Sequence, residues 1–177
     1  IRQCISGRLF IKVPITVKIT NLVNNVNSNA PDYAPVLSGD ESILIFTSKR
    51  KGSTGGKIDD DGNYFEDIYL SKSTRNQNWQ PSSKLDTTGR ISFFKSLFSR
   101  ADKISKSINT KNQDASIALS TDGKTLYIYR DNDIWQSDFD GSNWAKPKRL
   151  NENINSKKYH EPSVSPGADG KVLYVVS

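Results

Sequence analysis

The sequence predicts an all-β fold built from tandem four-stranded antiparallel sheets. One motif recurs three times along the chain, and each copy alternates short runs of β-branched and aromatic residues with turn residues such as Asp-Gly. Turn signals every few residues exclude helical repeats, and a β-sandwich would not require near-identical units in tandem. The repeated unit, with about 46 residues and four short strands, is typical of a β-propeller blade.

The first half of each unit is predicted to be a hairpin. In the first copy it runs from Asp32 through a turn at Asp40, in the second it runs from Asp114 through a turn at Asp122, and the two copies align without a gap. The third copy has its turn at Asp169, with one extra residue before it. Asp-Gly and similar pairs tolerate the backbone conformations of tight hairpins, so they are expected to connect the first two strands.

The second half of the unit occurs in the first two copies. Residues 67–71 (Asp-Ile-Tyr-Leu-Ser) and 133–137 (Asp-Ile-Trp-Gln-Ser) are predicted to form the third strand, and an outer strand is expected at the end of each unit. The intervening turns contain Trp79 and Trp144 with a nearby Pro, which suits an edge or the start of a strand. Both Trp side chains are expected to pack within the blades.

About two and a half blades are expected in this chain. The sequence begins at Ile1, contains no Met and ends inside an apolar run, whereas closed propellers usually need about four to eight blades. Flanking chain is therefore expected to close the ring, and the piece is not expected to be stable alone. The expected segments are leading strands over 1–20 that join or close the propeller, blade one over 21–85, an inserted helical segment over 86–107, blade two over 108–150 and the start of blade three over 151–177.

Six stretches of the sequence match a known kind of repeat. They are 32–36 (Asp-Tyr-Ala-Pro-Val), 45–50 (Ile-Phe-Thr-Ser-Lys-Arg), 65–69 (Phe-Glu-Asp-Ile-Tyr), 108–110 (Ile-Asn-Thr), 120–127 (Ser-Thr-Asp-Gly-Lys-Thr-Leu-Tyr) and 154–156 (Ile-Asn-Ser). Together they resemble the TolB-like, or WD40-like, propeller repeats of Bacteroidetes envelope proteins that combine a tetratricopeptide region, a propeller and an OmpA-like peptidoglycan-binding domain.

The resemblance implies a periplasmic, outer-membrane-associated scaffold, because such relatives include a component of the type IX secretion and gliding machinery. It implies other envelope proteins as partners, and no cofactor is expected. This chain contains neither the helical repeats nor the OmpA-like domain, so the resemblance does not assign peptidoglycan binding to it.

An insertion between the first two blades interrupts the repeat. Apolar residues at helical spacing predict one short inserted helix near residues 91–104, with basic side chains beside its apolar face. The candidate partner-docking residues are Ile91, Phe93, Phe94, Leu97, Phe98, Lys95 and Arg100. Three roles stay open: packing on the propeller flank, docking a protein partner, and peripheral contact with a membrane surface.

Composition and charge exclude several functions. The net charge is +6, but 25 basic residues are mixed with 19 acidic ones and no nucleic-acid-binding motif occurs, so no nucleic-acid partner is expected. No apolar run is long enough to span a membrane. Cys4 is the only cysteine, so no internal disulfide can form.

No residue pattern predicts catalysis or a strong metal site. The acidic loop at 59–63 does not fit an EF-hand register, so a solvated loop is expected, with a loosely bound cation as the alternative. His160, the single histidine, is assigned to the first Asp position of its unit, where a turn role is expected. Glu66 and Asp67 could pair for glycoside hydrolysis, but Asp67 recurs as Asp133, which favours an architectural role. The repeated turn Asp residues are expected to accept hydrogen bonds from nearby backbone N–H groups.

The sequence therefore predicts a non-catalytic scaffold or protein-binding propeller. Two alternatives stay open. One is a carbohydrate- or peptidoglycan-interacting propeller module, and the other is the propeller domain of a hydrolase whose catalytic domain lies outside this chain.

Overall fold

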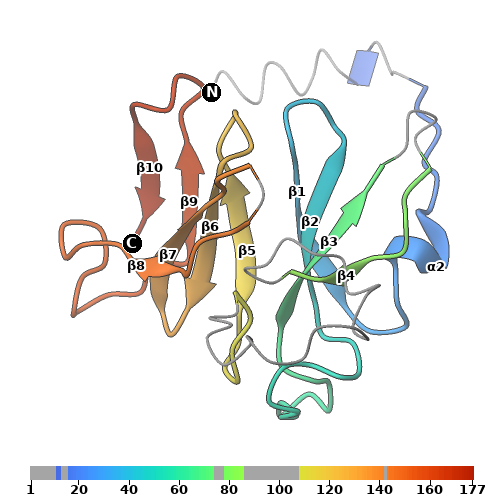
Figure 1. The fold of residues 1–177 in the computed structure, drawn as a ribbon, viewed down its shortest axis with the longest axis horizontal. Helices are drawn as coiled ribbons and strands as arrows, with labels where there is room; N and C mark the ends of the chain where they lie inside the picture. Colours follow the sequence, from blue (N-terminus) through green and yellow to red (C-terminus); the bar gives the residue numbers. More distant parts are fainter. Residues whose placement is uncertain (1–10, 13–15, 74–77, 86–107, 142) are drawn as a thin grey trace.

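The computed structural model describes residues 11–12, 16–73, 78–85, 108–141 and 143–177. In these residues the chain is mostly β, as expected. Antiparallel sheets of four, four and two strands lie side by side, and none of them closes on itself (Figure 1).

The first sheet is a simple meander. Its strands are β1 (Asp32–Leu37), β2 (Ile43–Ser48), β3 (Asp67–Lys72) and β4 (Ser83–Lys84), and each pairs antiparallel with the next. The long connection between β2 and β3 contains the acidic loop. The order and number of strands match the unit predicted from the sequence.

The second sheet repeats the first. It contains β5 (Ala115–Leu119), β6 (Thr125–Arg130), β7 (Asp133–Asp138) and β8 (Lys148–Arg149), again in chain order. The pairing of β5 with β6 is interrupted by a register shift near the middle of the strand, as is the pairing of β1 with β2. Such a shared irregularity indicates that the two units follow one backbone plan.

The third sheet has two strands, β9 (Ser163–Pro166) and β10 (Leu173–Val176), which form an antiparallel hairpin. It lies beside the second sheet (Figure 1). Strand β9 contacts β5 of that sheet. The first strand of each unit is therefore the one that lies against the first strand of the next unit.

Apolar side chains fill the spaces between neighbouring sheets. Alternation along the strands sends one set of side chains to each face, so a sheet can pack on both sides. The core between the first two sheets is formed by Ile45, Ile68, Leu85, Ile108, Leu126, Ile128 and Trp144. The core between the second and third sheets is formed by Ala118, Ile134 and Val164, with partly buried neighbours such as Tyr127 and Leu173.

The outer face of the first sheet is covered by the chain that precedes it. The short helix α2 (Val23–Val26) places Val26 against Leu44, Phe46 and Tyr69, and Trp79 packs on the same cluster. With Trp144 in the neighbouring core, both Trp side chains pack within the sheets as predicted.

The expected leading strands are not formed in the described part of residues 1–20. Residues 16–20 adopt neither helix nor strand, and Ile11 and Lys12 have helical conformation. Val17 and Ile19 are 70% and 92% exposed. No described strand pairs with residues 16–20, and whether residues 1–20 join or close the propeller stays a prediction.

A buried asparagine in each linker ties one unit to the next. The Asn109 Oδ1 accepts a hydrogen bond from the backbone N–H of Ile68 at 2.6 Å, and its Nδ2 donates to the carbonyl oxygens of Ile68 and Leu85, both at 2.9 Å. Asn155 repeats this arrangement on Ile134 of the second sheet, at 2.7 and 2.8 Å. The recurring Ile-Asn motif thus joins the third strand of one unit to the chain that enters the next.

Candidate functional site

The residues predicted to dock a partner lie outside the described residues. Ile91, Phe93, Phe94, Leu97, Phe98, Lys95 and Arg100 all fall within 86–107. Their role stays a prediction, and the candidate sites described below come from the sheets and turns.

The acidic loop between β2 and β3 is held by a lysine. The Lys49 Nζ lies 3.0 Å from the Asp59 Oδ2, 2.9 Å from the Asp61 Oδ2 and 3.7 Å from the Glu66 Oε1. Its hydrogen bonds lower the pKa of Asp59 and bring that of Asp61 to about 2. The ammonium of Lys49 therefore takes the position that a bound cation would need.

The neighbouring carboxylates of Glu66 and Asp67, for which the sequence favours an architectural role, have separate partners. The Tyr33 hydroxyl donates to the Glu66 Oε1 at 2.7 Å. Asp67 is fully buried, accepts a hydrogen bond from the Thr54 N–H at 2.7 Å and forms an ion pair with the Lys84 Nζ at 2.9 Å. Asp67 thus binds the outer strand β4 and the β2–β3 connection to β3.

The same link occurs in the second sheet. Asp133, the counterpart of Asp67, forms an ion pair with Arg149 of β8 at 2.6 Å. A carboxylate at the start of the third strand therefore holds the outer strand in both units, which is an architectural use of the recurring residue.

The hairpin turns are stabilised by their aspartates, as predicted. Asp40, Asp122 and Asp169 each accept a hydrogen bond from the backbone N–H two residues later, at 3.1, 3.0 and 3.1 Å. The hydroxyls of Ser38 and Ser120 donate to the first two of these carboxylates at 2.6 Å. These hydrogen bonds lower the pKa of Asp40 to about 2.

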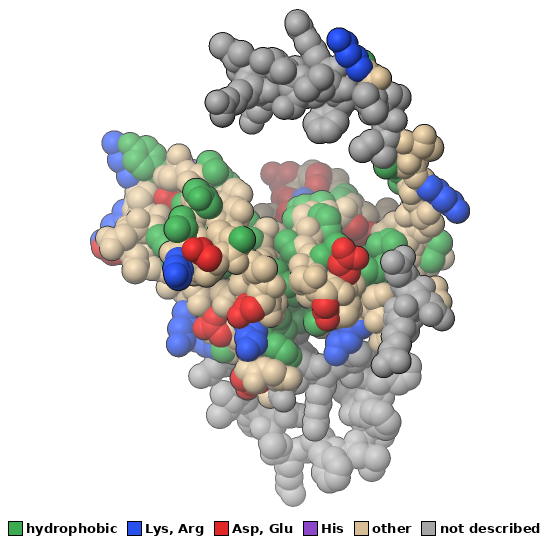
Figure 2. Space-filling view, turned by 90° about the horizontal axis from the view of Figure 1, so that it is seen from above, with side chains coloured by type: hydrophobic (Ala, Val, Ile, Leu, Met, Phe, Trp, Pro, Cys, Tyr) green, Lys and Arg blue, Asp and Glu red, His purple; other side chains and the backbone are tan. Residues whose placement is uncertain are grey.

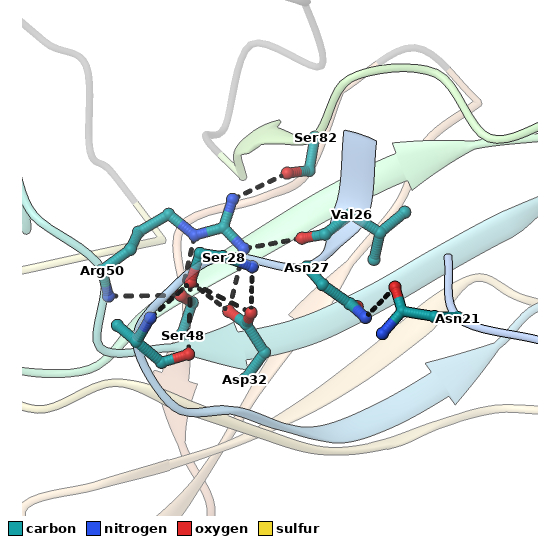
Figure 3. A network of polar contacts seen from close by, with 9 residues as sticks. Asn21, Val26, Asn27, Ser28, Asp32, Ser48, Arg50 and Ser82 are labelled. Carbon is teal, nitrogen blue, oxygen red and sulfur yellow. Dashed lines mark hydrogen bonds and ion pairs between the residues drawn. The ribbon is translucent and has the colours of Figure 1, made fainter. Parts of the chain in front are cut away.

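An arginine joins the start of the first hairpin to the chain around it (Figure 3). The Arg50 Nη2 lies 2.8 Å from the Asp32 Oδ1 and donates to the Val26 carbonyl oxygen at 2.8 Å, while its Nη1 donates to the Ser82 Oγ at 2.9 Å. The guanidinium also lies over the ring of Tyr69, 4.4 Å from its centroid. One side chain thus connects α2, β1, β3 and the segment before β4.

The second unit makes the same connection with a different residue. Arg130, at the end of β6, binds the Asp114 carboxylate and the Ile108 carbonyl oxygen, and both charged side chains are buried. Burial raises the pKa of Asp114, and the charge of Arg130 opposes that rise. Arg130 aligns with Ser48 rather than with Arg50, so the equivalence of the two guanidinium groups is not visible in the aligned sequence.

In the third unit the corresponding acid is Glu161, which corrects the assignment of His160. The Glu161 Oε1 accepts hydrogen bonds from the Ser156 N–H at 3.2 Å and the Ser156 Oγ at 3.0 Å, as Asp114 does from Thr110. The extra residue of the third copy therefore lies between Ser156 and Glu161. His160 precedes the acid position and does not occupy it.

A cleft of about 490 Å³ lies between the hairpin turns of the second and third sheets. Asp122, Tyr127, Asp169 and Lys171 contribute to its walls. Figure 2 looks onto this end of the molecule, where acidic, basic and hydrophobic side chains are intermixed. The hairpin turns of the first and second sheets leave no such space between them. A Cβ atom added to Gly39 in the first turn would lie 2.9 Å from the backbone oxygen of Thr121 in the second turn.

Comparison with protein-family models, with curated proteins and with solved structures finds no match for this chain. Among the described residues, no cluster of three or more His, Cys, Asp or Glu side chains is placed to hold a metal ion. Within the same residues, no helix has the length and apolar character needed to cross a membrane.

Proposed function

We propose that this chain is part of a β-propeller that serves as a non-catalytic, protein-binding scaffold in a cell-envelope assembly. The observation that carries the proposal is the contact between successive first strands, β1 with β5 and β5 with β9. The Ser116 Oγ of β5 donates to the Ala34 carbonyl oxygen of β1 at 3.0 Å. Sheets that meet through their first strands and spread outward from them have the arrangement of propeller blades.

The scaffold role is supported by how the repeated polar residues are used. Asn109 and Asn155 bind backbone, Asp67 and Asp133 bind outer strands, and the turn aspartates bind their own turns. A residue that recurs at equivalent positions of several units and bonds the backbone there has an architectural role. A binding platform needs this kind of rigid frame, with recognition left to less regular surfaces.

The location and the partners are proposed from the sequence resemblance. A periplasmic, outer-membrane-associated protein of the type IX secretion and gliding kind would have other envelope proteins as partners. The segment near 91–104 is proposed as the docking element, because aromatic and basic residues at helical spacing suit a protein interface.

Deletion of residues 88–105 tests this proposal. We expect an unchanged melting temperature together with the loss of envelope proteins that crosslink to the intact chain in cells, because a docking element contributes to binding and not to the fold. Loss of stability with unchanged crosslinking would instead assign the segment to packing on the sheets. Replacing Lys95 and Arg100 by Gln provides a control, since loss of binding to anionic vesicles alone would indicate a membrane-surface role.

A carbohydrate-interacting module is the second candidate function, and the cleft between the second and third turns favours it. The cleft combines the phenol of Tyr127 with carboxylates and a lysine, which are groups that bind sugar hydroxyls and rings. Carbohydrate binding can be measured by co-sedimentation of the chain with peptidoglycan, and by its binding to glycan arrays. Saturable binding that is lost in the Tyr127→Ala variant would support the carbohydrate-interacting function. The absence of binding above background would contradict it and favour the protein-binding scaffold.

A further inference from the structure

Two hairpin turns of the chain carry the same Asp-Gly pair. Asp122-Gly123 lies in the second turn, between β5 and β6, and Asp169-Gly170 lies in the third turn, between β9 and β10. A lysine follows the glycine in both turns. The local sequence Asp-Gly-Lys thus occurs at equivalent places in two units, so any difference in its chemistry must come from its surroundings.

An Asp-Gly pair can rearrange without an enzyme. The main-chain nitrogen of the glycine attacks Cγ of the aspartic acid, an N–Cγ bond forms, and the carboxyl hydroxyl leaves with the amide proton as water. Water then opens the resulting succinimide at one of its two carbonyl groups, which gives either aspartate again or isoaspartate. Glycine favours the attack because it has no Cβ beside the nitrogen. The carboxyl group must be free to turn towards that nitrogen.

The two turns have the same backbone. Gly123 and Gly170 have positive φ angles of 71° and 69°. Their N–H groups donate to the carbonyl oxygens of Ser120 and Gly167, at 2.8 and 3.0 Å. The aspartates of both turns are exposed, and each accepts the N–H of the residue two positions later. Backbone geometry and exposure therefore do not distinguish the two pairs.

One side chain does distinguish them. In the second turn the Ser120 hydroxyl donates to the Asp122 carboxylate at 2.6 Å, and this hydrogen bond lowers the pKa of Asp122. Gly167 takes the place of this serine in the third turn. Among the described residues, the Asp169 carboxylate has only the Lys171 N–H as a partner, at 3.1 Å. A side chain therefore restrains the first carboxylate and not the second.

The other Asp-Gly pairs of the chain are held more closely. The Asp61 carboxylate accepts hydrogen bonds from the Lys49 Nζ and from the Asn63 N–H, both at 2.9 Å. Asp140 accepts the main-chain N–H three residues later at 2.7 Å, which is shorter than the bond at Asp169. Within the described part of the chain, Asp169 is therefore the aspartate of this kind with the least restrained carboxylate.

We infer that Asp169-Gly170 is a modification site, where the folded protein forms succinimide and then isoaspartate faster than at the matched pair Asp122-Gly123. This goes beyond the scaffold role, because the reaction needs only water and the turn itself. Isoaspartate adds a methylene group to the main chain and displaces the carboxylate that binds the Lys171 N–H. These three residues of the third turn also line the cleft beside the second turn, so the product changes one wall of that cleft.

Gly167→Ser supplies the missing hydroxyl. A Cβ at Gly167 would lie 3.4 Å from the Asp169 Oδ1 and 3.3 Å from the Val172 carbonyl oxygen, and the φ of this glycine is outside the left-handed region. A serine therefore fits after a shift of its neighbours, as Ser38 and Ser120 do in the other turns. We expect this variant to form isoaspartate at Asp169 about three- to tenfold more slowly, the effect of one hydrogen bond.

Ser120→Gly is the reciprocal change. It removes the hydroxyl that holds Asp122 and leaves the backbone bonds of the turn in place. We expect it to speed the reaction at Asp122 about three- to tenfold, up to the rate at Asp169.

Peptide mapping measures both sites in one sample. Trypsin releases residues 112–124 and 159–171, which both end in Asp-Gly-Lys. The folded protein is incubated for several weeks at mildly acidic pH, and isoaspartate in each peptide is resolved by liquid chromatography and mass spectrometry. We expect it to accumulate about three- to tenfold faster in 159–171 than in 112–124. In concentrated urea the two rates are expected to become equal, because the local sequences are the same.

Three results would overturn the inference. One is an equal rate at the two sites of the folded protein. Another is a difference that persists unchanged in urea, since it would then not come from the folded turns. The third is an unchanged rate at Asp169 in Gly167→Ser. If that variant does not fold, an unchanged rate at Asp122 in Ser120→Gly counts against the inference in its place.

Discussion

At the scale of single residues, buried polar side chains connect one unit to the next. Asn109 is 1% exposed and joins three backbone groups of the first unit to the linker that enters the second. Asn27 occupies the same place in the first unit, but no sheet precedes it among the described residues, and its amide binds the side chain of Asn21. The same residue type therefore has a structural role only where a neighbouring sheet is present.

Asn109→Ala is expected to lower the free energy of unfolding by about 3 kcal/mol or more, because it leaves buried backbone N–H and C=O groups without partners. Asn27→Ala provides the control and is expected to cost less than about 1 kcal/mol, since its hydrogen bond is exposed. Urea unfolding followed by tryptophan fluorescence measures both. Equal effects of the two substitutions would contradict the linker role of Asn109.

The buried ion pair of the second unit gives a second test at this scale. Arg130→Met is expected to destabilise the chain by about 3–5 kcal/mol, because Asp114 then remains buried without a cation. Arg149→Met removes the partly exposed ion pair with Asp133 and is expected to destabilise the chain much less than Arg130→Met does. Thermal melts of both variants provide the comparison. A larger loss in Arg149→Met would show that the buried pair is not what holds the second unit.

At the scale of the hairpin and the loop, several carboxylates ionise more easily in the folded chain than in the unfolded chain. Hydrogen bonds from Ser38 lower the pKa of Asp40 to about 2, and Lys49 brings that of Asp61 to about 2. The pKa values of three further carboxylates are lowered, namely those of Asp32, Asp59 and Asp122. Asp114 has the opposite shift, since burial raises its pKa.

Acid is therefore expected to destabilise the fold. Below the ordinary Asp pKa of about 4 the unfolded chain binds more protons at the lowered groups, so their contribution is fully present above about pH 5 and is lost as the pH falls towards about 2. Unfolding free energies measured by urea across this range should fall steadily. Asp40→Asn should reduce the slope, and a chain whose stability is unchanged down to about pH 2 would contradict these shifts.

The strands could be predicted from the sequence because each has its own local signals. Alternating β-branched residues and Asp turns mark β1, β2, β5 and β6, and the structure has strands at these places. Residues 16–20 show similar alternation but form no strand in the described part of the chain, because a strand also needs a neighbouring edge to pair with.

The polar network could be predicted only in part. The turn aspartates recur in register and could be assigned, whereas Arg50 and Arg130 come from positions two residues apart in the repeat and meet the same acid position only in three dimensions. The third copy also has one extra residue between Ser156 and Glu161, so counting along the sequence assigned His160 instead of Glu161 to the acid position. Long side chains reach one point from different backbone positions, so alignment of the units does not reveal them.

At the scale of the whole molecule, the described chain is a row of sheets with unequal ends. The outer face of the first sheet is covered by α2, with Leu44, Phe46 and Tyr69 buried beneath it. At the other end of the row, Tyr174 and Val176 of β10 are exposed among the described residues.

The central claim is that the sheets are blades arranged around one axis, and an experimental structure of the complete gene product tests it most directly. The account predicts that β1, β5 and β9 lie innermost and side by side around that axis, with β4 and β8 at the rim. Two facing layers packed as a sandwich, or first strands at the outer rim, would contradict it.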